Sequence, residues 1–84
     1  MMPMADVEVK LPPLGDDAPD EARLSFFYVK EGDALKKGDD LCEMVTDKAT
    51  FNVPSPSDGI VKRILAKEDD TVTVGDALAI LTVT

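Results

Sequence analysis

The sequence contains no histidine and no tryptophan, and it has one cysteine among its 84 residues. Without histidine, the chain lacks the side chain that most often serves as a general base or as a metal ligand near neutral pH. The lone Cys42 excludes an internal disulfide and a cysteine-rich zinc site. These absences argue against autonomous hydrolysis, dithiol redox chemistry and zinc catalysis, and they favour a domain that carries or binds something.

Basic residues are also scarce, and no long apolar segment is present. Nine Lys and Arg stand against 17 Asp and Glu, which gives a net charge of −8. This sign is wrong for binding nucleic acid or anionic lipid, so we expect protein partners with basic docking faces. No apolar run approaches the roughly 20 residues that cross a bilayer, and residues 1–6 lack the features of a signal peptide. We expect a bacterial cytoplasmic location, or the mitochondrial matrix if a transit peptide has been removed.

An internal repeat organises the chain, which we expect to form one monomeric domain over 1–84 with an ordered core at about 6–83. Residues 30–41 align with 67–78 at an offset of 37, with six of twelve positions identical. Upstream, residues 7–12 match 49–54 at an offset of 42. The difference predicts about five extra residues in the first half, in the loop 13–22.

Short apolar runs with period-two alternation, broken by Gly-Asp and Pro-containing turns, predict small antiparallel strands. No segment longer than about ten residues has a helical stripe of apolar residues. Strands are expected at 6–12, 23–30, 34–36, 40–46, 49–55, 59–65, 71–74 and 77–83. Neither half could bury its apolar face alone. The predicted fold is therefore all-β, a flattened eight-stranded barrel or sandwich of two four-stranded antiparallel sheets with pseudo-twofold symmetry.

The same alternation predicts which side chains form the core. The expected inward positions are Val7, Val9, Leu11, Leu24, Val29, Leu35, Leu41, Met44, Phe51, Val53, Ile60, Ile64, Val72, Leu78 and Ile80. Cys42 alternates with Met44, and we interpret it as a small buried hydrophobe rather than a reactive thiol.

A tight turn at 46–49 joins the two halves of the repeat. Its repeat equivalents fall just beyond the two ends of the chain, so the pseudo-twofold axis predicts the turn at one end and both termini at the other. Strand 6–12 must then run towards the turn, and the acidic loop 13–22 should begin near Lys48.

Asp47 and Lys48 fit the two central turn positions, which makes Lys48 an exposed amine at the tip of a rigid ribbon. On position alone, such a lysine is an ordinary solvated surface charge.

The stretch 43–59, EMVTDKATFNVPSPSDG, resembles the attachment region of the lipoyl domains of 2-oxo acid dehydrogenase acyltransferase components. Segments similar to VKEGD at 29–33 and GDAL at 75–78 also occur in that family, and the similarity covers residues 7–83. The resemblance implies that Lys48 becomes amide-linked to lipoic acid.

The resemblance also implies roles for the neighbours of this lysine. Asp47 and Ala49 match the family motif and would be read by a lipoylating enzyme, although Asp47 has an equally good interpretation as a turn former. Gly15, Asp16 and Asp17 lie on the loop that the family uses for decarboxylase recognition, and the alternative for this acidic loop is simple solubility.

The resemblance implies that the chain is a carrier with no active site of its own and that it is part of a dihydrolipoamide acyltransferase. In the family, the swinging arm shuttles acyl groups and electrons between a thiamin-diphosphate 2-oxo acid decarboxylase, the acyltransferase core and a flavin dihydrolipoamide dehydrogenase. The protein then contributes proximity and docking, while the cofactor supplies the chemistry.

Three other interpretations stay open. Biotin carboxyl carrier domains share the architecture, but their lysine lies between two methionines, whereas the neighbours here are Asp47 and Ala49. The glycine-cleavage hydrogen carrier is a longer lipoylated relative with additional helical segments. An unmodified β domain that only binds proteins is the third. Two departures from the lipoyl pattern are Val45, where an acidic or polar residue is frequent, and a loop at 16–21 without the usual glycine-rich, acidic pattern.

Overall fold

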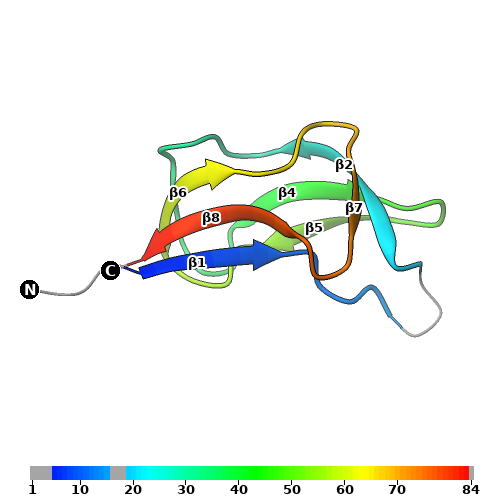
Figure 1. The fold of residues 1–84 in the computed structure, drawn as a ribbon, viewed down its shortest axis with the longest axis horizontal. Helices are drawn as coiled ribbons and strands as arrows, with labels where there is room; N and C mark the ends of the chain where they lie inside the picture. The colour runs from blue at the N-terminus through cyan, green and yellow to red at the C-terminus, as the bar shows by residue number, and fades with distance from the viewer. Residues whose placement is uncertain (1–4, 16–18, 84) are drawn as a thin grey trace, which may run out of the picture.

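The computed structural model describes residues 5–15 and 19–83, which form two four-stranded antiparallel sheets (Figure 1). The strands are β1 (Ala5–Lys10), β2 (Glu21–Phe27), β3 (Ala34–Leu35), β4 (Asp40–Val45), β5 (Thr50–Pro54), β6 (Gly59–Ile64), β7 (Thr71–Thr73) and β8 (Ala77–Val83). One sheet has the order β1-β8-β6-β3 and the other β5-β4-β2-β7. The predicted all-β fold is confirmed. None of the described segments forms a helix that is long and apolar enough to cross a membrane.

The pseudo-twofold relation between the halves is visible in matched backbone hydrogen bonds. The amide of Leu24 donates to the carbonyl of Asp70 at 2.8 Å, and the amide of Val61 donates to that of Asp33 at 2.8 Å. Each residue of the first bond lies 37 positions from its counterpart in the second. The offset of 37 predicted from the sequence is therefore confirmed, and the two bonds place the turn before β7 in the same relation to β2 as the turn before β3 has to β6.

The offset between the first strands of the two halves is 44, and the predicted value of 42 is wrong. The amide of Leu11 donates to the carbonyl of Asp76 at 3.0 Å, and that of Ser55 donates to Asp39 at 2.7 Å. Because Asp39 and Asp76 are equivalent at the offset of 37, Leu11 corresponds to Ser55. A slip of two residues leaves the inward and outward alternation unchanged, so the apolar pattern could not detect it. The loop after β1 is accordingly longer than its counterpart by seven residues, not five.

The core lies between the two sheets. Its buried apolar residues are Val9, Leu11, Ala22, Leu24, Leu35, Leu41, Cys42, Met44, Val53, Val61, Ala66, Val72, Leu78, Ala79 and Leu81. Most of the predicted inward positions belong to this set or pack against it, and the buried position of Cys42 is confirmed.

Three predicted inward positions, Val7, Ile60 and Ile80, belong neither to this core nor to the residues packed against it. In β8 the residues on either side of Ile80, Ala79 and Leu81, are buried instead.

Ile60 is the clearest exception, because it is 51% exposed while Val61 is 1% exposed. The pairing of β6 with β8 changes register between Val61 and Arg63, which marks an irregularity of the β-bulge kind. The irregularity lets both Val61 and Ile64 reach the core side although they are three residues apart, so strict alternation counted back from Ile64 gives the wrong face.

The long direction of the fold separates the chain ends from the hairpin between β4 and β5. Figure 1 shows the start of β1 and the end of β8 at one side of the view and this hairpin at the other. Ala5 pairs with Val83, which brings the first and last strands together. β1 runs from this end towards the hairpin, as predicted.

Candidate functional site

The candidate site is the turn between β4 and β5. Val45 pairs with Thr50 at the end of the two strands, and the amide of Thr46 donates to the carbonyl of Ala49 at 2.8 Å. Asp47 and Lys48 occupy the two central positions and are exposed, as predicted. Neither has a positive φ, so the tolerance of aspartate for unusual dihedral angles is not used here.

Thr46 is a site residue to which the sequence analysis assigned no role. Its hydroxyl oxygen accepts hydrogen bonds from the backbone amides of Lys48 at 3.3 Å and Ala49 at 3.1 Å. Thr and Ser side chains commonly satisfy amides two or three residues further along a turn, so the threonine two residues before the lysine was the available signal. This side chain fixes the backbone that presents Lys48.

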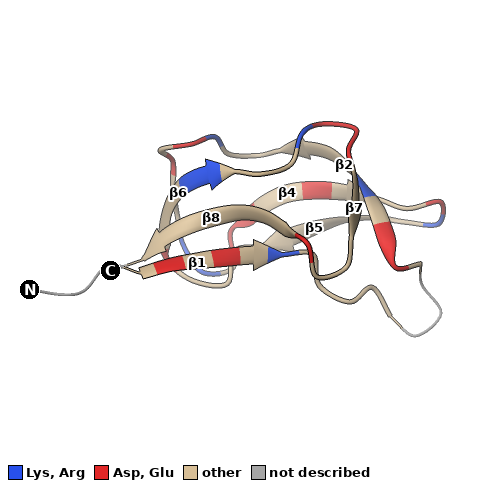
Figure 2. Ribbon diagram, in the orientation of Figure 1, with Lys and Arg blue, Asp and Glu red and all other residues tan. Residues whose placement is uncertain are grey.

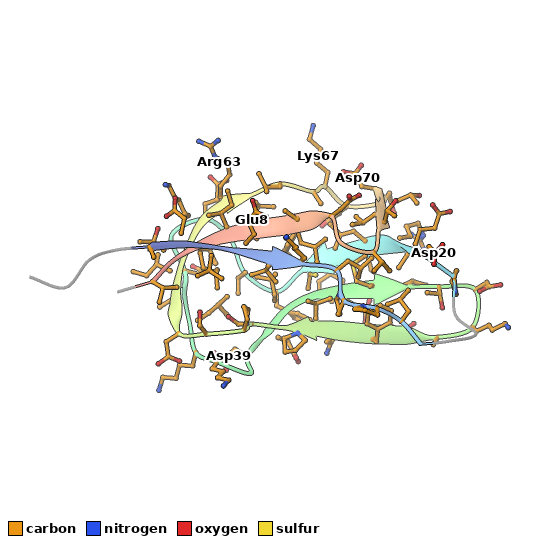
Figure 3. The ribbon with its side chains drawn as sticks, turned by 60° about the horizontal axis from the view of Figure 1, so that its bottom comes forward. Glu8, Asp20, Asp39, Arg63, Lys67 and Asp70 are labelled. Carbon is orange, nitrogen blue, oxygen red and sulfur yellow. The ribbon has the colours of Figure 1, made fainter. Side chains whose placement is uncertain are left out.

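The Lys48 side chain makes no ion pair within the described part of the chain. The ion pairs found there join Lys10 to Glu8, Arg23 to Asp69 and Lys62 to Asp6. Figure 2 shows one basic and one acidic stretch at the tip of the hairpin between β4 and β5, and Figure 3 shows Arg63 and Lys67 projecting outward from β6 and the segment after it. Over 5–15 and 19–83, no group of His, Cys, Asp or Glu is placed to hold a metal ion. Lys48 is thus an exposed amine without an ion-pair partner among the described residues.

A hollow of about 510 Å³ lies beside Lys48, which we call the tip hollow. Its described lining residues are Pro12, Pro13, Leu14, Gly15, Pro19, Thr46, Lys48, Ala49 and Phe51. The predicted proximity between the start of the loop 13–22 and Lys48 is thus confirmed. Among the predicted site residues, the structure brings Gly15 and Ala49 together with Lys48 around this hollow, whereas Asp16 and Asp17 lie outside the described residues.

A family model named Biotin_lipoyl, described as "Biotin-requiring enzyme", matches residues 7–81. The chain belongs to this family. Its curated relatives include the dihydrolipoyllysine-residue acetyltransferase component of the pyruvate dehydrogenase complex of Cupriavidus necator, which is 40% identical over 75 residues. The alignment covers 89% of this chain and 13% of that protein.

Two further relatives of this chain come from other 2-oxo acid dehydrogenase complexes. The mitochondrial lipoamide acyltransferase component of the branched-chain alpha-keto acid dehydrogenase complex of Bos taurus is 38% identical, over 86% of this chain and 15% of that protein. The succinyltransferase component of the 2-oxoglutarate dehydrogenase complex of Staphylococcus saprophyticus is 36% identical, over 88% of this chain and 17% of that protein. The chain thus spans only a small part of the curated relatives it matches.

A solved structure carries the same fold. It is the lipoyl domain of the 2-oxoglutarate dehydrogenase complex from Azotobacter vinelandii, with a TM-score of 0.69 and 25% identity. The match covers 89% of this chain and 95% of that chain. The resemblance to lipoyl domains stated from the sequence is confirmed, and the similarity extends over nearly the whole of that isolated domain.

Proposed function

We propose that this chain is a lipoyl carrier domain in which Lys48 holds lipoic acid through an amide bond. In this function the lipoyl arm shuttles acyl groups and electrons between the active sites of a 2-oxo acid dehydrogenase complex. The observation that carries the proposal is the exposed Lys48 amine, held at the tip of a hydrogen-bonded hairpin at the end opposite the chain termini. The lipoyl domain with the same fold and the acyltransferase relatives support it.

The residues at the tip fit a covalently attached acyl group. Lys48 supplies the nitrogen of the amide, and Thr46 holds the backbone on which this nitrogen is presented. When bound, lipoic acid supplies a disulfide that can be reduced and acylated. The chain contributes presentation: tethering raises the effective concentration of the group at each active site, and docking of the folded domain selects the partner.

The proposed partners follow from this function. A lipoylating enzyme would read the turn at Asp47 and Ala49. A thiamin-diphosphate decarboxylase, an acyltransferase core and a dihydrolipoamide dehydrogenase would then use the arm in succession. The position of Gly15 beside Lys48 supports a role for the loop 13–22, including Asp16 and Asp17, in decarboxylase recognition.

Intact-protein mass spectrometry tests the attachment. The domain is incubated with a lipoylating enzyme, lipoate and ATP, and separately with a biotin ligase, biotin and ATP. We expect the mass increase of one lipoyl group, located on Lys48 by peptide mapping, and its loss in Lys48→Arg with the fold unchanged. Biotin in place of lipoate would support the biotin carrier alternative, and no modification would support the unmodified binding domain.

A composition-matched control separates presentation from sequence. The exchange of Asp47→Lys with Lys48→Asp keeps every residue type but moves the amine by one turn position, where side chains point differently. We expect this variant to lose lipoylation. Full modification of the displaced lysine would show that the enzyme reads a flexible peptide and not a presented turn.

A further inference from the structure

The described lining residues of the tip hollow are unusual for this chain because almost none of them is charged. Charged residues make up 31% of the sequence, yet Lys48 is the one charged residue among the described lining residues. The segment 12–15 forms one wall and carries no charged residue, and Figure 2 shows the loop that follows β1 without charge at its start. A hollow with such walls favours a neutral, apolar occupant over a solvated charged group.

Two half-buried apolar side chains give the hollow a fixed floor. Leu14 and Phe51 both pack against the core while they line the hollow, so they join it to the rigid part of the domain. Three prolines complete the apolar lining, at 12, 13 and 19. The volume of about 510 Å³ lies within the range of roughly 300–1,000 Å³ that is usual for small-molecule sites.

Acylation of Lys48 would change the character of this hollow. The Lys48 ammonium is its one described charge, and conversion of the amine to an amide removes that charge. The same reaction attaches a hydrocarbon chain that ends in an apolar sulfur-containing ring. The modification therefore removes the one charge found among the described lining residues and tethers an apolar group beside their apolar side chains.

We propose that the tip hollow binds the lipoyl group carried by Lys48 of the same domain. This inference rests on the proposed function. Because the group is tethered at the rim, its effective concentration is in the millimolar range or above, and weak apolar contacts suffice to populate a docked state. The arm then exchanges between a docked state against Leu14 and Phe51 and an extended state that partner active sites draw out.

Solution NMR of three forms of the domain tests the docked state. The forms are unmodified, lipoylated on Lys48, and acetylated on Lys48 through genetically encoded acetyl-lysine. Acetylation removes the same charge but adds no arm, so it isolates the effect of the arm. We expect nuclear Overhauser contacts between arm protons and the side chains of Leu14 and Phe51 in the lipoylated form. We also expect amide shifts at 14, 15 and 51 that the acetylated form does not show.

A matched pair of leucine variants links these signals to the hollow. Leu14→Ser removes part of the apolar floor, whereas Leu65→Ser changes a leucine that is 46% exposed and lies outside the hollow. In lipoylated samples with native-like spectra, Leu14→Ser should lose the arm contacts to Phe51, and Leu65→Ser should keep them. If Leu14→Ser fails to fold, the acetyl comparison on the unaltered chain decides the question.

The outcomes separate this inference from the proposed function. Every sample is first shown by intact mass to carry one lipoyl group, so failure of attachment appears there and concerns the proposed function. Identical spectra for the lipoylated and acetylated forms beyond residues 47–49 would overturn the docked state. The tip hollow would then be available to bind an apolar side chain of a partner protein, and the proposed carrier function would be unaffected.

Discussion

The hydroxyl oxygen of Thr46 accepts a hydrogen bond from the backbone amide of Ala49 at 3.1 Å, across the turn that carries Lys48. Two-residue hairpins usually rely on positive φ angles, which match the twist of the flanking strands. This turn has none, and the threonine side chain binds the amides that the turn leaves free. The presentation of Lys48 thus depends on the Thr46 side chain, which binds the backbone of the turn and not the Lys48 amine.

Thr46→Val tests this dependence because it keeps the shape of the side chain and removes the hydroxyl. The hydroxyl accepts two hydrogen bonds, each worth about 0.5–1.5 kcal/mol, so the presented turn should become roughly 5- to 150-fold less populated relative to other conformations of this segment. We expect a corresponding fall in kcat/KM for the lipoylating enzyme acting on this domain. Thr46→Ser retains the hydroxyl and should stay near the original value. Equal rates for the valine and serine variants would show that the hydroxyl plays no part.

The loop beside Lys48 predicts a second, separable effect. Replacement of Asp16 and Asp17 by asparagine should slow reductive acylation by the cognate decarboxylase, while lipoylation of Lys48 and thermal stability change little. The control is Asp6→Asn with Glu8→Gln, which makes the same change in net charge on β1. The acylation rate of each double variant is measured by quenching the reaction at set times and quantifying the acylated domain by mass spectrometry. A loop that is only a solvated acidic surface would leave the two double variants indistinguishable.

Most of the fold could be predicted because alternation and turn residues act locally. All eight strands fall within the expected ranges or within two residues of them, and the repeat correctly placed the termini opposite the hairpin. Local patterns do not record register, however. The pairing that makes Leu11 equivalent to Ser55 is set by contacts with distant turns, so a slip of two residues was invisible in the sequence.

The site shows the same division between local and long-range information. Lys48 at a turn follows from residues 46–49 alone, whereas its proposed role as an attachment point came from the resemblance and not from spacing. The tip hollow could not be predicted, because its lining combines residues 12–15 with Phe51, which are far apart in the sequence. The exposed position of Ile60 was missed for a related reason, since an irregularity in β6 resets the alternation.

The repeat also predicts where the backbone is strained. Gly32 has a φ of 96°, and its counterpart at the offset of 37 is Asp69, with a φ of 71°. A Cβ at Gly32 would meet nothing within 4 Å, so Gly32→Ala tests the backbone conformation alone. We expect a loss of about 1 kcal/mol, seen as a fall in Tm of about 4–8 °C.

Gly32→Asn is the matched control, because asparagine adopts this conformation more readily than alanine. It should lose clearly less stability than Gly32→Ala in the same thermal unfolding experiment. A Tm for the alanine variant equal to that of the original chain would contradict the assignment of strain at this turn.

Cys42 matters for the proposed function because a carrier of a disulfide-containing group must keep its own thiol out of exchange reactions. The side chain is 0% exposed, and burial raises the pKa of the Cys42 thiol to about 12. Thiol–disulfide exchange requires an accessible thiolate, so Cys42 should not react with the arm. We expect no reaction with a chromogenic disulfide reagent at pH 8 in the folded domain and reaction of one thiol after unfolding in urea. Labelling of the folded domain at the rate of the unfolded chain would contradict this.

The same raised pKa predicts a loss of stability in alkali. The unfolded thiol ionises near its ordinary pKa of 9.0, whereas the folded thiol stays protonated until about 12. Above pH 9 the unfolded state therefore binds fewer protons, and the free energy of unfolding falls as the pH rises towards 12. Between pH 8 and pH 10 this contribution amounts to about 1 kcal/mol. Cys42→Ala lacks the titrating group, so urea unfolding of both proteins at the two pH values isolates it: the stability advantage of the original chain over the variant should shrink by that amount. The same advantage at both pH values would show that the thiol ionises as easily in the folded domain as in the unfolded chain. The proposed exclusion of Cys42 from exchange with the arm would then rest on steric burial alone.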